Sequence, residues 1–384
     1  MVNSNANALG ILFPNSYDSL VPDLVSERLM ASIPFASRYR LVDFILSSMA
    51  NCGIDNISLI VRRNYHSLMD HLGSGREWDL TRKNGGLNLV PPYAEKTVSI
   101  YNGRVEALAG ILDFLKEQKE KYVVMADTNL AVNFDFNALI EAHMASHADV
   151  TVAYKEEPLP IDLIEHRDIG KSLYYTLAID NGRVTKMYMN SSEPGMQNIS
   201  MNIYIIDREL LISQINTAYV RGQVYFERDI LAPQLERLNV QAFRYDGYVA
   251  RISSMKSYFN ENMKMLDDVN VDALFSAGNP ISPIYTKIRD DNPARYINGS
   301  KVSNIMAADG CIIEGEVENS ILFRGVRVGK GAWVKNCVLM QDTVIEADAG
   351  VEYVVTDKNA TITRGKIIKG TVTFPVYVAK YQIV

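Results

Sequence analysis

The stretch from Ile11 to Cys52 contains no glycine, although an α/β protein that binds nucleotides usually has several glycines at this position. A loop that wraps a triphosphate needs positive φ angles and backbone N–H groups close to the anion, and side chains and proline obstruct both. Here a short apolar segment at residues 8–13 runs directly into Pro14, and the first basic residue of the chain is Arg28. The sequence therefore predicts a loop that does not bind a triphosphate.

Three motifs in the following residues carry a family resemblance. They read IPFASRYRLVDF at residues 33–44, GSGREWDL at residues 73–80 and GGLNLVPP at residues 85–92. In this order they resemble the bacterial ADP-glucose pyrophosphorylases (glucose-1-phosphate adenylyltransferases), and the likeness covers nearly the whole chain. Within that family the chain is most similar to the GlgD-type regulatory subunit, the non-catalytic companion of the GlgC-type catalytic subunit in glycogen synthesis.

The resemblance implies that the nucleotide half of the site has lost its chemistry. Asp127 matches the first Mg²⁺-binding aspartate of the family, but Tyr225 replaces the second one, and Met30 replaces a lysine of the phosphate loop. Nucleotidyl transfer normally needs a second carboxylate, because the ion must be held while it bridges phosphate oxygens. Glu227 or Asp229 could supply it, but we interpret both as ordinary charges on a helix face. We therefore expect Asp127 to be vestigial and no catalytic set to be intact.

The resemblance also implies losses in the sugar-phosphate half of the site. Residues 188–194 replace a Glu-Lys-Pro segment whose lysine holds glucose 1-phosphate in the family, and Asn202 replaces a glycine that leaves room for the ligand. Residues 251–253 read Arg-Ile-Ser in place of Asp-Val-Gly, and residues 103–107 read GRVEA in place of G-T-A-[DN]-A. Changes at this many independent positions indicate that the reaction has been lost.

A group of basic residues is a candidate site for an effector. Arg38 replaces a lysine that contributes to the allosteric anion site of the family, and Arg40 is retained beside it. Together with Arg364, Lys366 and Lys369 of the C-terminal domain, they would bind a phosphorylated sugar effector. The alternative is that all five are solvated charges.

The composition excludes several classes of function. At 384 residues, with 47% hydrophobic and 22% charged residues, the chain is long enough for two or three domains. Its net charge of −6 argues against a nucleic acid partner, because such binding depends on clustered Lys and Arg. No signal peptide is recognisable before Arg28, and no apolar run approaches the roughly 20 residues of a membrane span. Because Cys52, Cys311 and Cys337 form no closed disulfide framework, the sequence predicts a cytoplasmic protein.

Strand-like and helix-like segments alternate over the first 250 residues. Helices are predicted at residues 41–52 and 104–120 from the spacing of apolar side chains. The predicted strands cover residues 8–13, 56–62, 122–127, 149–155, 174–180, 200–207 and 240–245. This alternation predicts an α/β fold with a mostly parallel, nucleotidyltransferase-like sheet and helices on both faces. A further helix and a linker are expected over residues 251–295.

The period of the sequence changes in the last part of the chain, residues 296–384. One apolar series repeats every six residues from Val326 to Val344, and a second runs from Val328 to Met340. This spacing predicts a left-handed parallel β-helix of hexapeptide repeats, with an antiparallel sandwich as the alternative. The series weakens at Glu314 and Ser320, where we expect a loop or a distorted coil.

The leading interpretation is a non-catalytic regulatory subunit of ADP-glucose pyrophosphorylase. It would assemble with a GlgC-type catalytic subunit, as a heterotetramer, and need no cofactor of its own, with Mg²⁺ bound only in the catalytic partner. The alternative is an active sugar-1-phosphate nucleotidyltransferase that makes ADP-glucose from ATP and glucose 1-phosphate in a rearranged site, for which Asp127 is the best evidence. A hexapeptide-repeat acyltransferase is disfavoured, because it would need a histidine in the β-helix, and His166 is the last in the chain.

Overall fold

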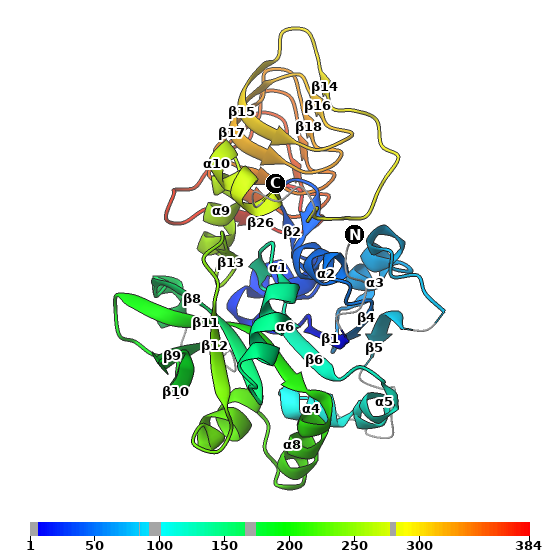
Figure 1. Cartoon of the computed structure of the whole chain (residues 1–384). Coiled ribbons are helices and arrows are strands. Elements are labelled where there is room, and N and C mark those ends of the chain that lie inside the picture. Colours follow the sequence, from blue (N-terminus) through cyan, green and yellow to red (C-terminus); the bar gives the residue numbers. More distant parts are fainter. Residues whose placement is uncertain (1–6, 84, 92–100, 166–173, 277–281) are drawn as a thin grey trace.

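The computed structural model describes residues 7–83, 85–91, 101–165, 174–276 and 282–384. An α/β unit forms the N-terminal part, and a stack of coils forms the C-terminal part above it (Figure 1). The end of the 85–92 motif, His166 and the first part of the predicted linker, at residues 277–281, lie outside the described residues.

A nine-stranded sheet runs through the N-terminal unit in the order β5-β4-β1-β6-β11-β8-β12-β10-β9. Among its described strands only β10 and β11 run against β1, so the sheet is mostly parallel, as predicted. The strands are β1 Ala8–Phe13, β4 Asn56–Ile60, β5 Gly86–Val90, β6 Tyr122–Asp127, β8 Val150–Pro158, β9 Tyr175–Asp180, β10 Arg183–Met189, β11 Met196–Asp207 and β12 Val240–Arg244. In the β1–β6 pair, Phe13 and Asp127 are register partners at the carboxyl ends of the strands.

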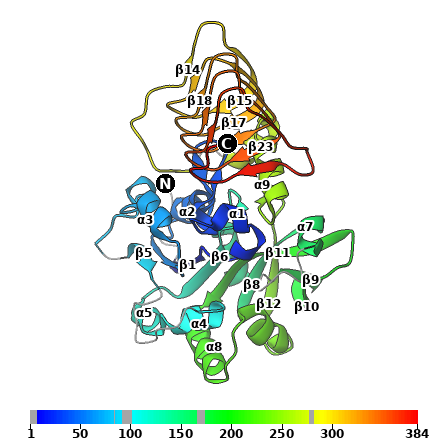
Figure 2. The same ribbon diagram turned by 180° about the vertical axis from the view of Figure 1, so that it is seen from behind.

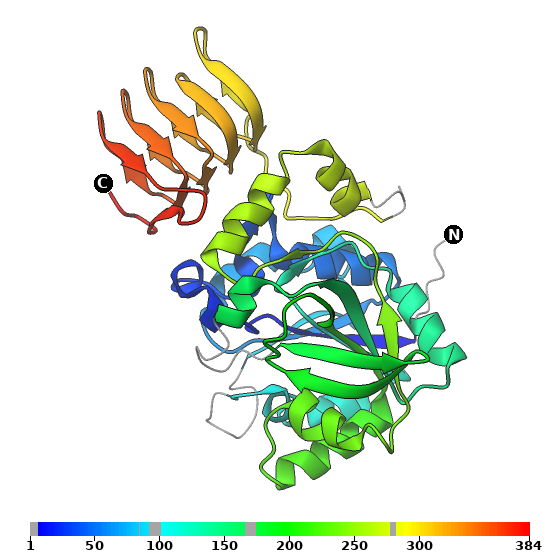
Figure 3. The same ribbon diagram turned by 90° about the vertical axis from the view of Figure 1, so that its left-hand side faces the viewer.

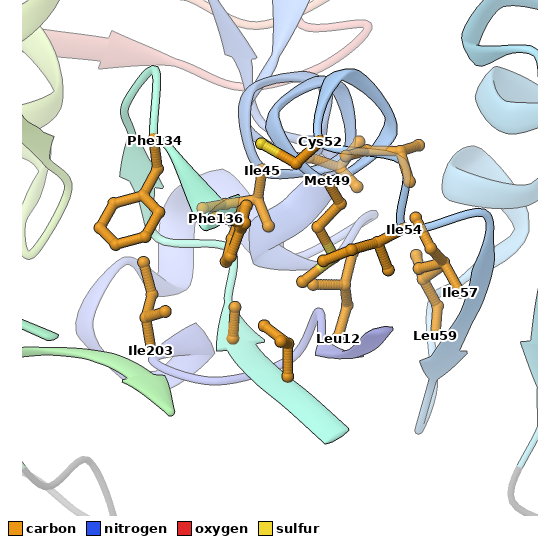
Figure 4. Close-up of a cluster of buried hydrophobic side chains, with 14 of the residues drawn as sticks. Leu12, Ile45, Met49, Cys52, Ile54, Ile57, Leu59, Phe134, Phe136 and Ile203 are labelled. Atoms are coloured by element: carbon orange, nitrogen blue, oxygen red, sulfur yellow. The ribbon is translucent and has the colours of Figure 1, made fainter. Parts of the chain in front are cut away.

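Helices cover both faces of this sheet. On one face α2 Leu41–Asn51 and α6 Phe136–Ala145 contribute to a buried cluster (Figure 4). On the other face lie α4 Arg104–Ala109, α5 Leu112–Glu117 and α8 Arg208–Val220, seen below the sheet in Figures 1 and 2. The remaining α-helices are α1 Pro22–Val25, α3 His66–Leu72, α7 Ile161–Glu165, α9 Met255–Lys264 and α10 Asp268–Val271. The continuous helix predicted at 104–120 was wrong, because Ile111 has non-helical dihedral angles that separate α4 from α5.

Close packing of α2 on the sheet depends on Gly10. A Cβ atom at this position would lie 2.9 Å from the sulfur of Met49 and 3.2 Å from the side chain of Ile57. Met49 and Ile57 are fully buried, and each such side chain stabilises the fold by about 1.5–3 kcal/mol. The close approach therefore fixes α2, and the motif at its N-terminus, against β1.

The C-terminal part is a parallel β-helix, as predicted, and Figure 3 shows its coils edge-on. Glu316, Trp333 and Gly350 are register partners, so successive coils are offset by 17 residues. The strands are β14 Arg295–Tyr296, β15 Lys301–Ala307, β16 Ile312–Ile313, β17 Glu316–Leu322, β18 Arg327–Val328, β19 Trp333–Lys335, β20 Val338–Leu339, β21 Val344–Ile345, β22 Gly350–Glu352, β23 Val354–Thr356, β24 Thr361–Ile362, β25 Ile367–Lys369 and β26 Val376–Val378.

The six-residue series required two corrections. A coil of 17 residues is one residue shorter than three hexapeptides, so positions six residues apart do not all point inward. Val344, which the series places inward, is only half-buried, whereas its neighbours Thr343 and Ile345 are fully buried. Ser320 also faces inward within the continuous strand β17, and no loop interrupts the coil there. Its hydroxyl donates to the carbonyl of Glu318 and accepts the backbone N–H of Cys337, so the buried polar group is satisfied.

The two parts meet across a third hydrophobic cluster. Phe35 and the α9 residues Tyr258 and Phe259 pack with Ile321 and Val338 of the β-helix. Leu130–Ala131 (β7) pairs with Ala250–Arg251 (β13), so residues 250–251 belong with the N-terminal unit, and α9 carries the chain to the junction. The β-helix is thus anchored to the α/β unit by a packed interface.

Candidate functional site

Asp127 lies at the carboxyl end of β6, where its carboxylate is surrounded by donors from the same chain. It is 2% exposed and accepts hydrogen bonds from Ser16 Oγ at 2.7 Å, Arg104 Nη2 at 2.6 Å and Asn202 Nδ2 at 2.9 Å. Ser16 belongs to the turn after β1, and Asn202 lies in a bulge of β11 with a φ of 53°. The oxygens of Asp127 are therefore occupied by protein donors.

Arg104 links Asp127 to a second buried carboxylate. Its Nη2 atom contacts Asp127 and its Nη1 atom forms an ion pair with Glu227. The guanidinium also lies over the rings of Phe13, at 5.1 Å, and Tyr204, at 5.5 Å. Burial lowers the pKa of Arg104, but the charge and hydrogen bond of Asp127, together with Tyr204 and Tyr17, outweigh burial and raise that pKa above its usual range. The guanidinium thus provides a permanent positive charge between two acids.

Gly103 allows Arg104 to reach this position. A Cβ atom on Gly103 would lie 2.3 Å from the carbonyl oxygen of Val224, so no larger residue fits against that backbone. The N–H of Val105 donates to the same carbonyl at 3.1 Å. The start of α4 is therefore held directly beside the segment that carries Glu227.

The interpretation of Glu227 as a solvated helix-face charge was wrong. Glu227 is 4% exposed in the short helix Phe226–Leu231, and its partner is Arg104. Asp229 instead caps the start of this helix, where it accepts the N–H groups of Val224 and Tyr225, each at 2.9 Å. A hydrogen bond from Arg228 lowers the pKa of Asp229 to about 2. Asp229 is thus part of the local fold, and Glu227 is part of the buried cluster around Arg104.

This donor set does not fit a Mg²⁺ ion. Mg²⁺ needs near-octahedral oxygen ligands at about 2.0–2.1 Å and keeps several waters. Here a guanidinium separates Asp127 from Glu227, and Tyr225 stands where the resemblance places the second aspartate. Among the described residues, no group of three or more His, Cys, Asp or Glu side chains could hold a metal ion.

The loop after β1 fills space with side chains. Tyr17 has a φ of 67°, in the left-handed region that residues other than glycine rarely adopt. Its hydroxyl accepts a hydrogen bond from Asn202 Nδ2 at 2.5 Å. Burial raises the pKa of this hydroxyl. Met30 is fully buried in the cluster that joins the two parts of the chain. The loop therefore offers a tyrosine and a thioether where a phosphate would need N–H groups and a cation.

Two of the predicted effector residues lie at the domain junction. Arg38 is exposed, whereas Arg40 is 7% exposed and donates from Nη1 to the carbonyl and hydroxyl oxygens of Ser67, at 2.6 and 3.0 Å. Burial lowers the pKa of Arg40 to about 10. Across the junction, Arg28 forms a buried ion pair with Asp357 at 2.5 Å.

Sequence reasoning missed the cations of the β-helix and linker at this junction. Burial, together with the charges of Arg40 and Arg28, lowers the pKa of Lys358 to about 7. Arg324 has its pKa lowered by burial and then by Arg289 and Arg38. These basic residues come from distant parts of the sequence, and only the junction brings them together.

The other three predicted effector residues lie elsewhere on the β-helix. Arg364 pairs with Asp348 at 3.1 Å, and Lys369 pairs with Glu352 at 3.3 Å. Lys366 is exposed next to them. They follow or belong to strands β24 and β25, whereas the β-helix residues that pack at the junction come from β17 and β20. The structure therefore divides the predicted set of five into two separate groups.

Comparisons with known proteins agree with this architecture. A nucleotidyl transferase family model matches residues 23–267, and a model of the GlmU-like C-terminal hexapeptide matches residues 289–371. The glycogen biosynthesis protein GlgD of Bacillus subtilis (strain 168) is 32% identical over 98% of this chain and 96% of its own length. The GlgD protein of Geobacillus stearothermophilus is 34% identical over 86% and 83%, and the glucose-1-phosphate adenylyltransferase of the same organism is 29% identical over 85% and 83%.

The chain belongs to the family of GlgD proteins and glucose-1-phosphate adenylyltransferases. Within the described residues, no helix is long and apolar enough to cross a membrane.

The remaining departures from the adenylyltransferase motifs have structural roles of their own. Arg251, where the motif has aspartate, forms an ion pair with Glu157 of β8 at 3.0 Å. Asn190, in the segment that replaces Glu-Lys-Pro, adopts a φ of 49° and accepts the N–H of Tyr174 at 3.1 Å. These side chains hold the local backbone, and the segment at 188–194 offers no Lys or Arg for a sugar phosphate.

Proposed function

We propose that this chain is a non-catalytic regulatory subunit that assembles with a GlgC-type glucose-1-phosphate adenylyltransferase in glycogen biosynthesis. The observation that carries the proposal is the position of Arg104 between Asp127 and Glu227. A guanidinium there repels a metal ion and blocks the approach of both carboxylates to one.

The free-energy cost of breaking buried ion pairs favours a site that keeps this arrangement. Removing one partner from a buried ion pair leaves an uncompensated charge and costs about 3–5 kcal/mol. Both carboxylates pair with the same guanidinium, and Asp127 is 2% exposed. Binding of a metal between these carboxylates would therefore require breaking two charge-assisted contacts before any ligand bond forms.

The alternative, an active enzyme, receives support from two buried carboxylates, Asp127 and Glu227. Glu227 is a second buried carboxylate close to Asp127, as a rearranged metal site would require. Because Arg104 already forms ion pairs with both acids, we favour the regulatory role.

The last coil of the β-helix is a suitable assembly surface. It carries exposed apolar side chains, of which Phe374 is 79% exposed; the others are Ile367, Val372, Tyr381 and Ile383. Strands β25 and β26 form the two ends of their sheet, at the free end of the stack in Figure 3. Terminal coils and unpaired strand edges need a cap or a partner, and an apolar patch of this kind marks an interface. We assign this surface to contact with the catalytic subunit.

The junction cations are the proposed effector site. Arg38, Arg40 and Lys358 lie between the two parts of the chain, where an anion such as a phosphorylated sugar would bridge them. An effector that binds one arrangement of the assembly better than another shifts apparent affinity by about 5- to 150-fold.

An activity assay tests the proposal. The purified chain is incubated with ATP, glucose 1-phosphate and Mg²⁺, alone and mixed with a GlgC-type subunit, and ADP-glucose is measured. We expect negligible synthesis by the chain alone and a mixed oligomer whose response to effectors differs from that of the catalytic subunit alone. Turnover by the chain alone near a typical enzyme's roughly 10 s⁻¹ would contradict the proposal.

A disabled partner separates the two candidate functions. When the metal-binding aspartate of the catalytic subunit is replaced, the regulatory role predicts an inactive mixture, and Asp127→Ala in this chain then changes nothing. Residual activity that Asp127→Ala removes would establish the alternative.

A further inference from the structure

The outer face of the β-helix carries a hollow that the proposed function does not use. It has a volume of about 1200 Å³, which exceeds the 300–1,000 Å³ of typical small-molecule pockets. Its lining includes Trp333, Lys335, Glu352 and Lys369 from strands β19, β22 and β25, and Asn298 from the segment between β14 and β15. The hollow is thus large enough for an extended ligand.

Two parallel rows of register partners run along this face, and side chains from both rows line the hollow. The first row contains Lys301, Glu316, Trp333, Gly350 and Ile367, which are register partners from coil to coil. The second row contains Ser303, Glu318, Lys335, Glu352 and Lys369. Since neighbouring strands lie about 4.8 Å apart, five coils span about 19 Å.

Trp333 lies flat in the middle of the first row. A Cβ atom on Gly350 would lie 2.2 Å from the indole ring, so the ring covers that glycine directly. Lys369 approaches the ring with its ammonium 5.2 Å from the ring centroid, and its side chain is 58% exposed. This exposed lysine therefore lies over an aromatic face that a ligand can reach by displacing it. In the described part of the chain the indole N–H of Trp333 makes no hydrogen bond.

The charges around Trp333 favour a neutral ligand with many hydroxyl groups. Five cationic and four anionic side chains line the hollow, leaving a net charge of only +1. Lys301, Lys330, Glu314 and Glu316 form no ion pair among the described residues, so donors and acceptors are both available. A phosphorylated ligand would find four carboxylates nearby, whereas sugar hydroxyls donate and accept hydrogen bonds in turn.

We propose that this hollow binds a segment of α-glucan, with one sugar ring stacked on Trp333. The negative face of an indole attracts positively polarised C–H groups, as it attracts the ammonium of Lys369. The inference rests on the proposed function, because the GlgD relatives are named as glycogen biosynthesis proteins and glycogen is an α-glucan. Binding would hold the assembly on the polymer of its pathway.

Fluorescence provides a direct test, since the chain has only two tryptophans and Trp78 is 2% exposed. In a Trp78→Phe background, the emission of Trp333 is followed during titration with maltoheptaose, a linear α-1,4-glucan. We expect a saturable change, about tenfold weaker binding in Trp333→Ala when measured by calorimetry on the full chain, and partial retention in Trp333→Tyr.

A matched variant keeps this test independent of assembly. Phe374→Ala removes an exposed aromatic side chain from the same β-helix but outside the hollow. We expect it to weaken the mixed oligomer and to leave maltoheptaose binding unchanged, with the reverse result for Trp333→Ala.

Three results would overturn the glucan site. The first is equal maltoheptaose binding by Trp333→Ala and the unmodified chain, provided that both unfold at the same temperature. The second is stronger quenching of Trp333 by glucose 1-phosphate than by maltoheptaose, which would mean an anion site. The third is no glucan binding together with loss of the mixed oligomer in Trp333→Ala, which would mean a protein interface.

Discussion

At the scale of single residues, Arg104 makes a definite contribution to stability. We expect Arg104→Met to lower the free energy of unfolding by about 3–5 kcal/mol, because Asp127 and Glu227 would remain buried without compensation. The triple variant Arg104→Met/Asp127→Asn/Glu227→Gln removes all three charges and should recover most of that loss. Urea unfolding measures both. As a control, Arg244→Met, whose side chain is 53% exposed, should change stability by less than about 1 kcal/mol. Equal effects of Arg104→Met and Arg244→Met would show that the buried bridge is not a structural element.

At the scale of elements, the 17-residue length of a coil determines which side chains of β21 are buried and stabilise the fold. Ile345 is fully buried whereas its neighbour Val344 is half-buried. We expect Ile345→Ala to cost about 2–5 kcal/mol and Val344→Ala clearly less, because only the first leaves a cavity in the coil. A strict six-residue repeat requires the opposite order. Thermal or urea unfolding of the two variants distinguishes the models, and a larger loss for Val344→Ala would restore the strict repeat.

A second element-scale prediction concerns the start of the helix Phe226–Leu231. The pKa of Asp229, at about 2, lies below its ordinary value of 3.8, so this carboxylate stabilises the fold above about pH 4. That stabilisation is lost as the pH falls towards 2. We expect Asp229→Asn to lower stability by about 0.5–2 kcal/mol at pH 7, and the difference to shrink at pH 3. A difference that stays constant from pH 7 to pH 3 would contradict the capping role.

At the scale of the whole molecule, anions should stabilise the junction in a pH-dependent way. The pKa of Lys358 is lowered to about 7 from an ordinary 10.5, so between these values the unfolded chain binds a proton that the folded chain does not. Stability from this group therefore rises with pH from about 7 to 10.5. Glucose 1-phosphate, used as an anionic probe, should raise the melting temperature more at pH 6.5 than at pH 8.5, since Lys358 carries its charge at the lower pH.

Two variants locate that effect. Lys358→Met should reduce the stabilisation by glucose 1-phosphate and remove its dependence on pH, whereas Lys366→Met, on the exposed side of the β-helix, should leave both unchanged. An equal response in both variants would place the anion somewhere other than the junction.

Much of the fold could be predicted from the sequence because it depends on local patterns. Apolar strands such as β1 and β6, the helix at Leu41–Asn51 and the coil repeat are all encoded by nearby side chains. Strand β10 was not among the predicted strands, because most of its side chains are exposed and show no alternation of burial. The partial exposure of Val344 could not be predicted, because a coil of 17 residues contains the same types of residue as a coil of 18.

The sequence alone predicted that the catalytic motifs are broken, since a missing glycine or a tyrosine in place of an aspartate can be read position by position. Only the tertiary structure decided what replaced them. Arg104, Asp127 and Glu227 lie on separate elements, and their distances depend on the register of β1 with β6 and on the contact of Gly103 with Val224. The junction cations depend likewise on how the β-helix packs on the α/β unit. Electrostatic pairing depends on distance in space, and sequence separation carries little information about that distance once the chain has folded.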